Sequence, residues 1–198
     1  MKEFKFYFLY VGNAYPHKNL ERLIQTVVLL NKEVKDDIGL VIVSARNVFV
    51  KRLEAVVCRL SADSWVRILG FVPDEKLTVL YRGAAAFVSP SLSEGFGLPG
   101  LEAMKAGTLV LASDIPVFKE VYKENAIYFN PFDLVAIKDA MKAVLQVDPA
   151  QRARLIAKSQ VFIKRYSWSK MAEETLQVYS AAYRGVNRGT PPGCICIF

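Results

Sequence analysis

The stretch AAFVSPSLSEGFGLPGLEAMKAGTLVLA, residues 85–112 of this 198-residue chain, shows the order of elements that recurs along the sequence. It predicts a short apolar strand at 85–89, a loop with two glycines, a helix at 98–106 and a second apolar strand at 109–112. Strands that are apolar at every position, rather than at alternate positions, are typical of a parallel sheet buried on both faces. The stretch therefore predicts parallel strands joined by right-handed helical crossovers.

The same alternation extends in both directions from this stretch. Further strands are predicted at 4–11, 39–43, 66–69 and 126–129, and further helices at 19–33, 48–60, 74–81, 117–122, 134–145, from Asp148 onwards and at 168–183. Asp74 and Asp148 are expected to cap the helices that follow them. The predicted fold is α/β, a Rossmann-like doubly wound parallel sheet with three layers, over residues 1–183. Residues 184–198 are expected to form a flexible tail.

Composition narrows the class of protein. A hydrophobic fraction of 53% excludes a disordered chain, and the length suits one large domain or two small ones. The net charge of +7 admits nucleic acid, an anionic membrane surface or a phosphorylated small molecule as partner. The basic residues are scattered over many predicted helices, and no helix-turn-helix or zinc pattern occurs, so we expect no nucleic-acid partner.

The few cysteines, the single histidine and the lengths of the apolar runs bear on disulfide bonds, metal sites and membrane spans. Three cysteines cannot form a disulfide framework, and with a single histidine we expect no metal site. No run approaches the roughly 20 apolar residues of a membrane span, and the apolar residues 4–12 lack a signal-peptide cleavage site. These features predict a reduced, cytoplasmic chain.

The loop between strand 85–89 and helix 98–106 carries the chemistry. Gly95 and Gly97 allow the backbone to approach a ligand, and free N–H groups at the start of the helix favour an anion such as phosphate. Glu94 and Glu102 flank the loop, and each can accept hydrogen bonds from sugar hydroxyls. A molecule with hydroxyl groups at both ends and phosphates between them is a nucleotide sugar. The alternative is that Glu94 is a solvated loop charge and Glu102 an ordinary first-turn glutamate.

The run SEGFGLPGLEAM, residues 93–104, resembles the E-x7-E signature of retaining family 4 glycosyltransferases, in the glycosyl transferases group 1, which have the GT-B fold. Shorter pieces, at 10–13, 17–19, 69–73, 77–81, 106–108 and 112–116, resemble other parts of the donor-binding domain of that family. The resemblance covers residues 6–183. It implies that the chain is the C-terminal, donor-binding half of a GT-B enzyme, whose other half binds the acceptor.

The resemblance implies roles for individual residues. Glu102 would accept hydrogen bonds from the ribose, and Glu94 would hold hydroxyls of the transferred sugar. Lys18 would neutralise the diphosphate and stabilise the leaving group, although a surface lysine at a helix start is the alternative. Glu94 and Lys18 are thus the expected catalytic residues. The remaining expected donor-binding residues are Asn13, Phe71, Val72, Gly95, Phe96, Gly97 and Leu98, with Phe71 and Val72 beside the base.

The chain departs from the family pattern in two of its loops. Asn13 stands where many members carry an arginine, so its attraction for phosphate is weaker. Ser44-Ala45-Arg46 stands where a glycine is usual, and Arg46 is interpreted as a surface residue.

His17 has no second histidine or carboxylate beside it in sequence and is not expected to be catalytic. Apolar residues of the last helix, from Trp168 to Tyr183, are expected mostly to pack on the sheet of the domain.

The resulting hypothesis is a retaining hexosyltransferase half that uses a GDP- or UDP-sugar, with mannose as the sugar of choice and no cofactor. Its expected partners are an N-terminal acceptor-binding domain or subunit and a glycan or lipid-linked acceptor. A lipid-linked acceptor would bring the chain into peripheral contact with the inner membrane surface. The alternative hypothesis is a non-catalytic subunit or sensor that binds a nucleotide sugar.

Overall fold

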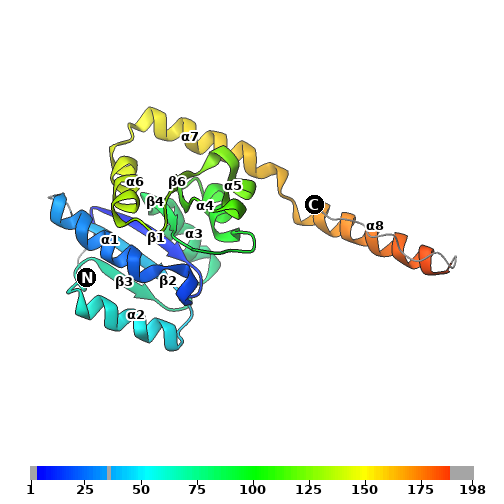
Figure 1. The fold of residues 1–198 in the computed structure, drawn as a ribbon. Coiled ribbons are helices and arrows are strands. Elements are labelled where there is room, and N and C mark those ends of the chain that lie inside the picture. Colours follow the sequence, from blue (N-terminus) through cyan, green and yellow to red (C-terminus); the bar gives the residue numbers. More distant parts are fainter. Residues whose placement is uncertain (1–3, 35–36, 188–198) are drawn as a thin grey trace. The chain divides into compact units, whose positions relative to one another are not determined.

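A computed structural model describes residues 4–34 and 37–187. They fall into two compact units, with the boundary in the chain after Ile163, and each unit is described by itself. The first unit contains one six-stranded sheet in which every pair of neighbouring strands is parallel (Figure 1). Its strands are β1 (Phe6–Val11), β2 (Ile38–Val43), β3 (Val66–Leu69), β4 (Ala86–Ser89), β5 (Val110–Ser113) and β6 (Ile127–Phe129).

The strand order is β3-β2-β1-β4-β5-β6. The chain moves outward in one direction from β1 to β3, and in the other direction from β4 to β6. The direction changes between β1 and β4, which pair at Phe8 with Ala86 and at Leu9 with Phe87. In doubly wound sheets, ligands bind at the carboxyl ends of the strands beside this switch point. The predicted Rossmann-like fold is confirmed.

Seven helices of this unit form the two outer layers. They are α1 (Leu20–Glu33), α2 (Val48–Arg59), α3 (Asp74–Gly83), α4 (Leu98–Ala106), α5 (Pro116–Tyr122), α6 (Leu134–Gln146) and α7 (Pro149–Phe162). Helix α1 contacts α2, α6 and β2, whereas α4 contacts α3, α7, β4 and β5. Short 3₁₀ turns occur at Pro16–Lys18, Lys123–Asn125 and Ile163–Arg165.

The helix starts test the capping predictions. Asp148 caps α7, because its side chain accepts hydrogen bonds from the amides of Ala150 and Gln151. The prediction for Asp74 is wrong: Pro73 occupies the cap position, and Asp74 is already the first residue of α3. Pro73 is extended, with a ψ of 149°, and its carbonyl accepts a hydrogen bond from the Leu77 amide at 2.8 Å, so the first turn of the helix already contains Asp74.

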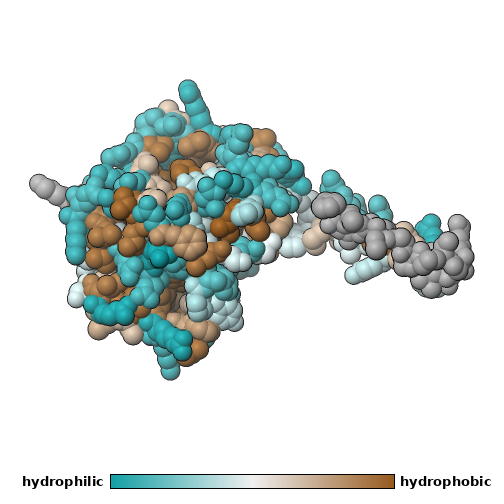
Figure 2. Space-filling view, in the orientation of Figure 1, coloured by the Kyte–Doolittle hydropathy of each residue, from teal (hydrophilic) through white to brown (hydrophobic). Residues whose placement is uncertain are grey.

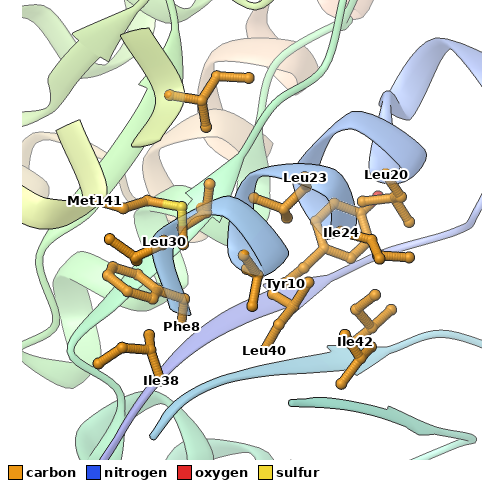
Figure 3. Packing of buried hydrophobic residues seen from close by; sticks show 14 of the residues in the cluster. Phe8, Tyr10, Leu20, Leu23, Ile24, Leu30, Ile38, Leu40, Ile42 and Met141 are labelled. Atoms are coloured by element: carbon orange, nitrogen blue, oxygen red, sulfur yellow. The ribbon is translucent and has the colours of Figure 1, made fainter. Parts of the chain in front are cut away.

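The core explains why the strands are apolar at every position. Phe8 and Tyr10 of β1 and Leu40 of β2 are buried on the side of the sheet that α1 covers, with Met141 of α6 beside them (Figure 3). Leu9 and Phe87 are also buried, although they do not belong to this cluster. Strands β2, β4 and β5 are buried at every position, and this burial on both faces removes the alternating pattern.

The surface of this unit is mixed, with hydrophilic and hydrophobic residues interspersed over the face seen in Figure 2. One ion-pair network links two helices: Glu33 at the end of α1 accepts hydrogen bonds from Lys138 and Lys142 of α6. These bonds lower the pKa of Glu33 to about 2. The network therefore fastens α1 to α6 at neutral pH.

The second unit contains helix α8 (Trp168–Asn187). Five of its apolar side chains are exposed, namely Trp168, Met171, Leu176, Tyr179 and Tyr183. Residues 164–187 by themselves hold no second layer that could cover one face of the helix, so the packing of these side chains on the sheet of the first unit stays a prediction. Residues 184–187 of the predicted tail belong to α8, and its remaining residues, 188–198, lie outside the described part. Among the described helices, none combines the length and apolar character needed to cross a membrane.

Candidate functional site

The first loop of the site leaves β1 at the switch point. The amide of Gly12 donates to the carbonyl of Val43 at 3.0 Å, and its φ of 148° is a conformation that side chains rarely adopt. The chain then turns through Pro16–Lys18 and enters α1 at Asn19, which has a φ of 58°. This path places Lys18 at the carboxyl edge of the sheet.

Asn19 fastens this loop to two others. Its side-chain amide donates to the carbonyls of Pro90 at 3.1 Å and Pro131 at 2.8 Å. The amide of Leu92 also donates to the carbonyl of His17 at 2.8 Å. Sequence reasoning missed this role of Asn19, which was predicted as the first residue of the helix, although asparagine is one of the few residue types that adopt the left-handed conformation. The bonds that involve Pro90 and Leu92 hold the loop after β1 against the loop after β4, and the bond to Pro131 holds it against the loop after β6.

Lys18 and Glu94, 76 residues apart, meet across these loops. The Lys18 Nζ lies 2.6 Å from the Glu94 Oε1, and the side chains are only 12% and 15% exposed. The hydroxyl of Ser91 donates to the same oxygen at 2.8 Å. Both charges are therefore held in place by the fold and are largely screened from water. The two residues expected to be catalytic are brought together.

Tyr10 lies beside this pair. Its hydroxyl donates to the carbonyl of Asn13 at 2.7 Å, which orders the first loop. Burial, together with the negative charge of Glu94, raises the pKa of Tyr10 far above its usual value. The hydroxyl therefore stays protonated and remains a donor at physiological pH.

Helix α4 begins at the site without a side-chain cap. Gly97 holds the cap position with a φ of 97°, and the next residue is Leu98. The first amides of a helix lack carbonyl partners within it and carry the positive end of the helix dipole. An anion in front of Gly97 and Leu98 would therefore be stabilised.

Tyr122 of α5 packs against the start of α4 and holds it in place. Its hydroxyl donates to the carbonyl of Gly97 at 2.6 Å, and its ring stacks on Phe118. A Cβ built on Gly97 would lie 2.3 Å from the Tyr122 hydroxyl oxygen, and one on Gly100 would lie 2.4 Å from it. Both positions therefore require glycine. By contrast, a Cβ on Gly95 would meet nothing within 4 Å.

Glu102 lies one turn further along α4 and is exposed. Its Oε2 accepts a hydrogen bond from the hydroxyl of Tyr81, at 3.2 Å. Tyr81 is buried at the end of α3, and this burial, with the charge of Glu102, raises the pKa of its hydroxyl. The neutral tyrosine holds one carboxylate oxygen of Glu102 and leaves the other free to accept bonds from a ligand.

These elements enclose a cavity of about 320 Å³. Its lining residues are Tyr10, Val11, Gly12, Asn13, Lys18, Phe87, Ser89, Glu94, Phe96, Gly97, Leu98, Pro99 and Tyr122. Six of the ten residues expected at the site line it. Of the others, Gly95 and Glu102 are exposed on the loop and on α4, and Phe71 and Val72 lie on the loop between β3 and α3.

The sequence analysis did not name Tyr10, Ser91, Tyr81 or Tyr122 as site residues. The three tyrosines support the loops from the sheet or from neighbouring helices, where no local pattern relates them to the motif, and Ser91 lies in the loop itself, three residues before Glu94. In the described part of the chain, no three His, Cys, Asp or Glu side chains are grouped as metal ligands.

The chain belongs to the glycosyl transferases group 1 family, whose model matches residues 2–173. Among curated proteins it is 38% identical to the O-antigen chain mannosyltransferase RfbU of Salmonella typhimurium, over 87% of this chain and 46% of that protein. It is 36% identical to the O-antigen chain mannosyltransferase B of Escherichia coli, over 87% of this chain and 45% of that protein. The chain thus spans about half the length of the curated relatives it matches.

The solved structures agree with this relationship. The sucrose-phosphate synthase of Thermosynechococcus elongatus superposes with a TM-score of 0.80 at 25% identity, over 91% of this chain and 46% of that one. The predicted fold, one Rossmann-like half of a GT-B glycosyltransferase, is confirmed, and the resemblance drawn from residues 93–104 is confirmed at the level of the family.

Proposed function

We propose that this chain is the donor-binding half of a retaining family 4 glycosyltransferase, which transfers mannose from a nucleoside diphosphate sugar to a glycan or lipid-linked acceptor. The observation that carries the proposal is the ion pair between Lys18 and Glu94, in a cavity at the switch point and in front of the uncapped α4. The two O-antigen mannosyltransferases among its relatives favour mannose as the sugar.

In this proposal the diphosphate lies in front of α4. Its charges are met by the amides of Gly97 and Leu98 and by the ammonium group of Lys18. When the bond between the sugar carbon and the diphosphate oxygen breaks, negative charge develops on that oxygen. A cation that is already held in place, only 12% exposed, stabilises this charge without reorganisation. Lys18 is thus assigned to the leaving group.

The two carboxylates bind the two sugar rings of the donor. Glu94, oriented by Ser91, accepts hydrogen bonds from hydroxyls of the mannose, next to the exposed backbone of Gly95 and Phe96. Glu102, oriented by Tyr81, accepts hydrogen bonds from the ribose.

The base lies beside Phe71 and Val72. The Phe71 side chain is 85% exposed and offers one face for stacking. Asn13 borders the cavity in the position where many family members have an arginine, and it contributes polar contacts without charge. The donor is a GDP- or UDP-sugar, and the proposed reaction uses no metal or organic cofactor.

The acceptor side is assigned to a second, N-terminal domain or subunit, since the chain spans about half of its curated relatives. A cleft between two such halves would place the acceptor hydroxyl over the sugar held by Glu94. We assign the complete enzyme to the cytoplasm, in peripheral contact with the inner membrane surface where a lipid-linked acceptor would lie.

Calorimetric titration of the chain with GDP, UDP, GDP-mannose and UDP-glucose tests the proposal. At least one nucleoside diphosphate should bind, and Lys18→Ala should weaken it by about 10- to 100-fold, the effect of losing a hydrogen bond to a charged group. Glu102→Ala should weaken nucleotide and nucleotide sugar equally. Lys105→Ala, an exposed lysine at the other end of α4, is the matched control and should change neither affinity. A folded chain that gives no heat with any of the four ligands contradicts the proposal.

A further inference from the structure

The turn between β2 and α2 lies at the same edge of the sheet as the candidate site, and no role has been assigned to it. Ser44 follows β2, and its amide donates to the carbonyl of Leu69 at 3.1 Å, at the end of β3. Asn47 ends the turn and caps α2 by accepting hydrogen bonds from two amides of its first turn. The backbone on either side of Arg46 is therefore fixed next to the loop that begins at Gly70.

Arg46 reaches toward that loop. A Cβ built on Gly70 would lie 3.6 Å from the Arg46 Nε and 3.8 Å from its Cγ, which is van der Waals contact. The residue is exposed, and within the described part of the chain its guanidinium group makes no hydrogen bond or ion pair. From its sequence, Arg46 was predicted to be an ordinary surface residue. These distances instead place the Arg46 side chain beside Gly70, the residue that precedes Phe71 in the loop assigned to the base.

The chemistry of the guanidinium group selects among bases. It carries five N–H donors in a planar fork, has no acceptor and remains charged at all physiological pH values. Guanine presents two adjacent acceptors, O6 and N7, which such a fork contacts with two parallel hydrogen bonds. Adenine presents a donor beside N7, and cytosine presents a donor in place of O6. Uracil has one acceptor at the corresponding edge. Guanine is therefore the base that fits Arg46 best.

The free aromatic ring completes a platform for the base. Phe71 is 85% exposed, although its neighbours Leu69 and Val72 are partly buried. A purine stacked on this ring would turn its edge toward the turn that carries Arg46. The ribose would then lie between this loop and Glu102, in the direction of the diphosphate at α4.

We infer that Arg46 determines the specificity of the donor site and selects guanine nucleoside diphosphates by donating two hydrogen bonds to O6 and N7 of the base. The inference rests on the proposed function, because it requires the base to lie beside Phe71. The inference adds Arg46, which lies outside the motif at residues 93–104, to the proposed donor site, and it identifies the base of the donor as guanine.

Calorimetric titration of the full chain with GDP, UDP, IDP and 7-deaza-GDP tests the inference. GDP should bind at least about 10-fold more tightly than UDP. IDP keeps both O6 and N7 and should bind like GDP, whereas 7-deaza-GDP lacks N7 and should bind more weakly. Arg46→Ala should lower the GDP affinity by about 10- to 100-fold, leave UDP unchanged and remove the difference between GDP and 7-deaza-GDP.

Two variants serve as controls. Arg46→Lys keeps the charge but not the fork, so it should restore little of the preference for GDP. Arg82→Ala, at an exposed arginine in the last turn of α3, should change no affinity. The inference is overturned if Arg46→Ala weakens GDP and UDP equally, or leaves GDP unchanged while GDP still binds. Failure of all four ligands to bind the wild-type chain contradicts the proposed function itself, and the role of Arg46 with it.

Discussion

Replacing Glu94 by glutamine tests how the two central charges share the site. In the structure, the Glu94 Oε1 forms an ion pair with the Lys18 Nζ at 2.6 Å, and both side chains are largely buried. A diphosphate that binds Lys18 must therefore compete with Glu94 for this group, and it also approaches a like charge. Glu94→Gln keeps the size of the side chain and removes both effects. The variant should therefore bind a bare nucleoside diphosphate more tightly than the wild type.

The distance sets an upper limit on the effect. Two unit charges at 2.6 Å attract each other by about 6 kcal/mol at an effective dielectric constant of about 20. The net contribution of a hydrogen bond between charged groups is smaller, about 1.5–3 kcal/mol, because desolvation opposes it. The amide oxygen of glutamine still accepts a hydrogen bond from the Lys18 ammonium group, so the lower part of this range applies. We expect an affinity gain of about 10-fold for the nucleoside diphosphate.

Calorimetry measures the change in affinity for the ligand, and thermal unfolding measures the change in the stability of the free chain. Glu94→Gln should lower the stability of the free chain by about 1–3 kcal/mol, because the largely buried Lys18 ammonium group keeps its charge and loses the opposite charge of the carboxylate. It should also reduce the advantage of a nucleotide sugar over the bare nucleotide, since the carboxylate no longer holds the sugar. Glu120→Gln, at an exposed glutamate of α5, is the control. An unchanged or weaker affinity for the nucleoside diphosphate would refute this reasoning.

Two further predictions concern stability. Gly97→Ala should lower the free energy of unfolding by about 2 kcal/mol or more, because its φ is 97° and the added methyl group would lie 2.3 Å from the Tyr122 hydroxyl. Urea unfolding measures this, with Gly95→Ala as the control; equal effects of the two variants would contradict the packing described here. The pKa of Glu33 is lowered to about 2, so its stabilising effect is complete above pH 4.5 and is lost as the pH falls toward 2. The stability difference between the wild type and Glu33→Gln should shrink over that interval; a constant difference would be inconsistent with the ion-pair network to α6.

The fold could be predicted from the sequence because its signals are local. The strands are short and apolar throughout, and Leu98–Ala106 was placed at its observed bounds by the glycines before it and the glycine after it. Asp148 was recognised as a cap because the next residue is Pro149. The surface that covers the apolar side chains of α8 could not be predicted in the same way, since an apolar stripe on a helix does not tell which surface covers it.

The candidate site could be predicted only where its residues form one continuous motif. Glu94, Gly97 and Glu102 were found together because they lie within nine residues of each other. The residues that orient them come from distant parts of the chain: Tyr122 acts through the Gly97 carbonyl and Tyr81 through Glu102. Such contacts arise from the packing of helices against the sheet, and neither residue carries a local pattern that marks it.

An NMR titration of the ¹⁵N-labelled chain with GDP tests the central claim most directly, because it reports where the nucleotide binds. The claim is that the diphosphate lies between Lys18 and the start of α4. Saturable shifts should therefore appear at the amides of Gly97 and Leu98 and around Lys18, and the Lys18→Ala variant should require a higher GDP concentration to reach them. Saturable shifts confined to other surfaces of the chain, with these amides unchanged, would contradict the account.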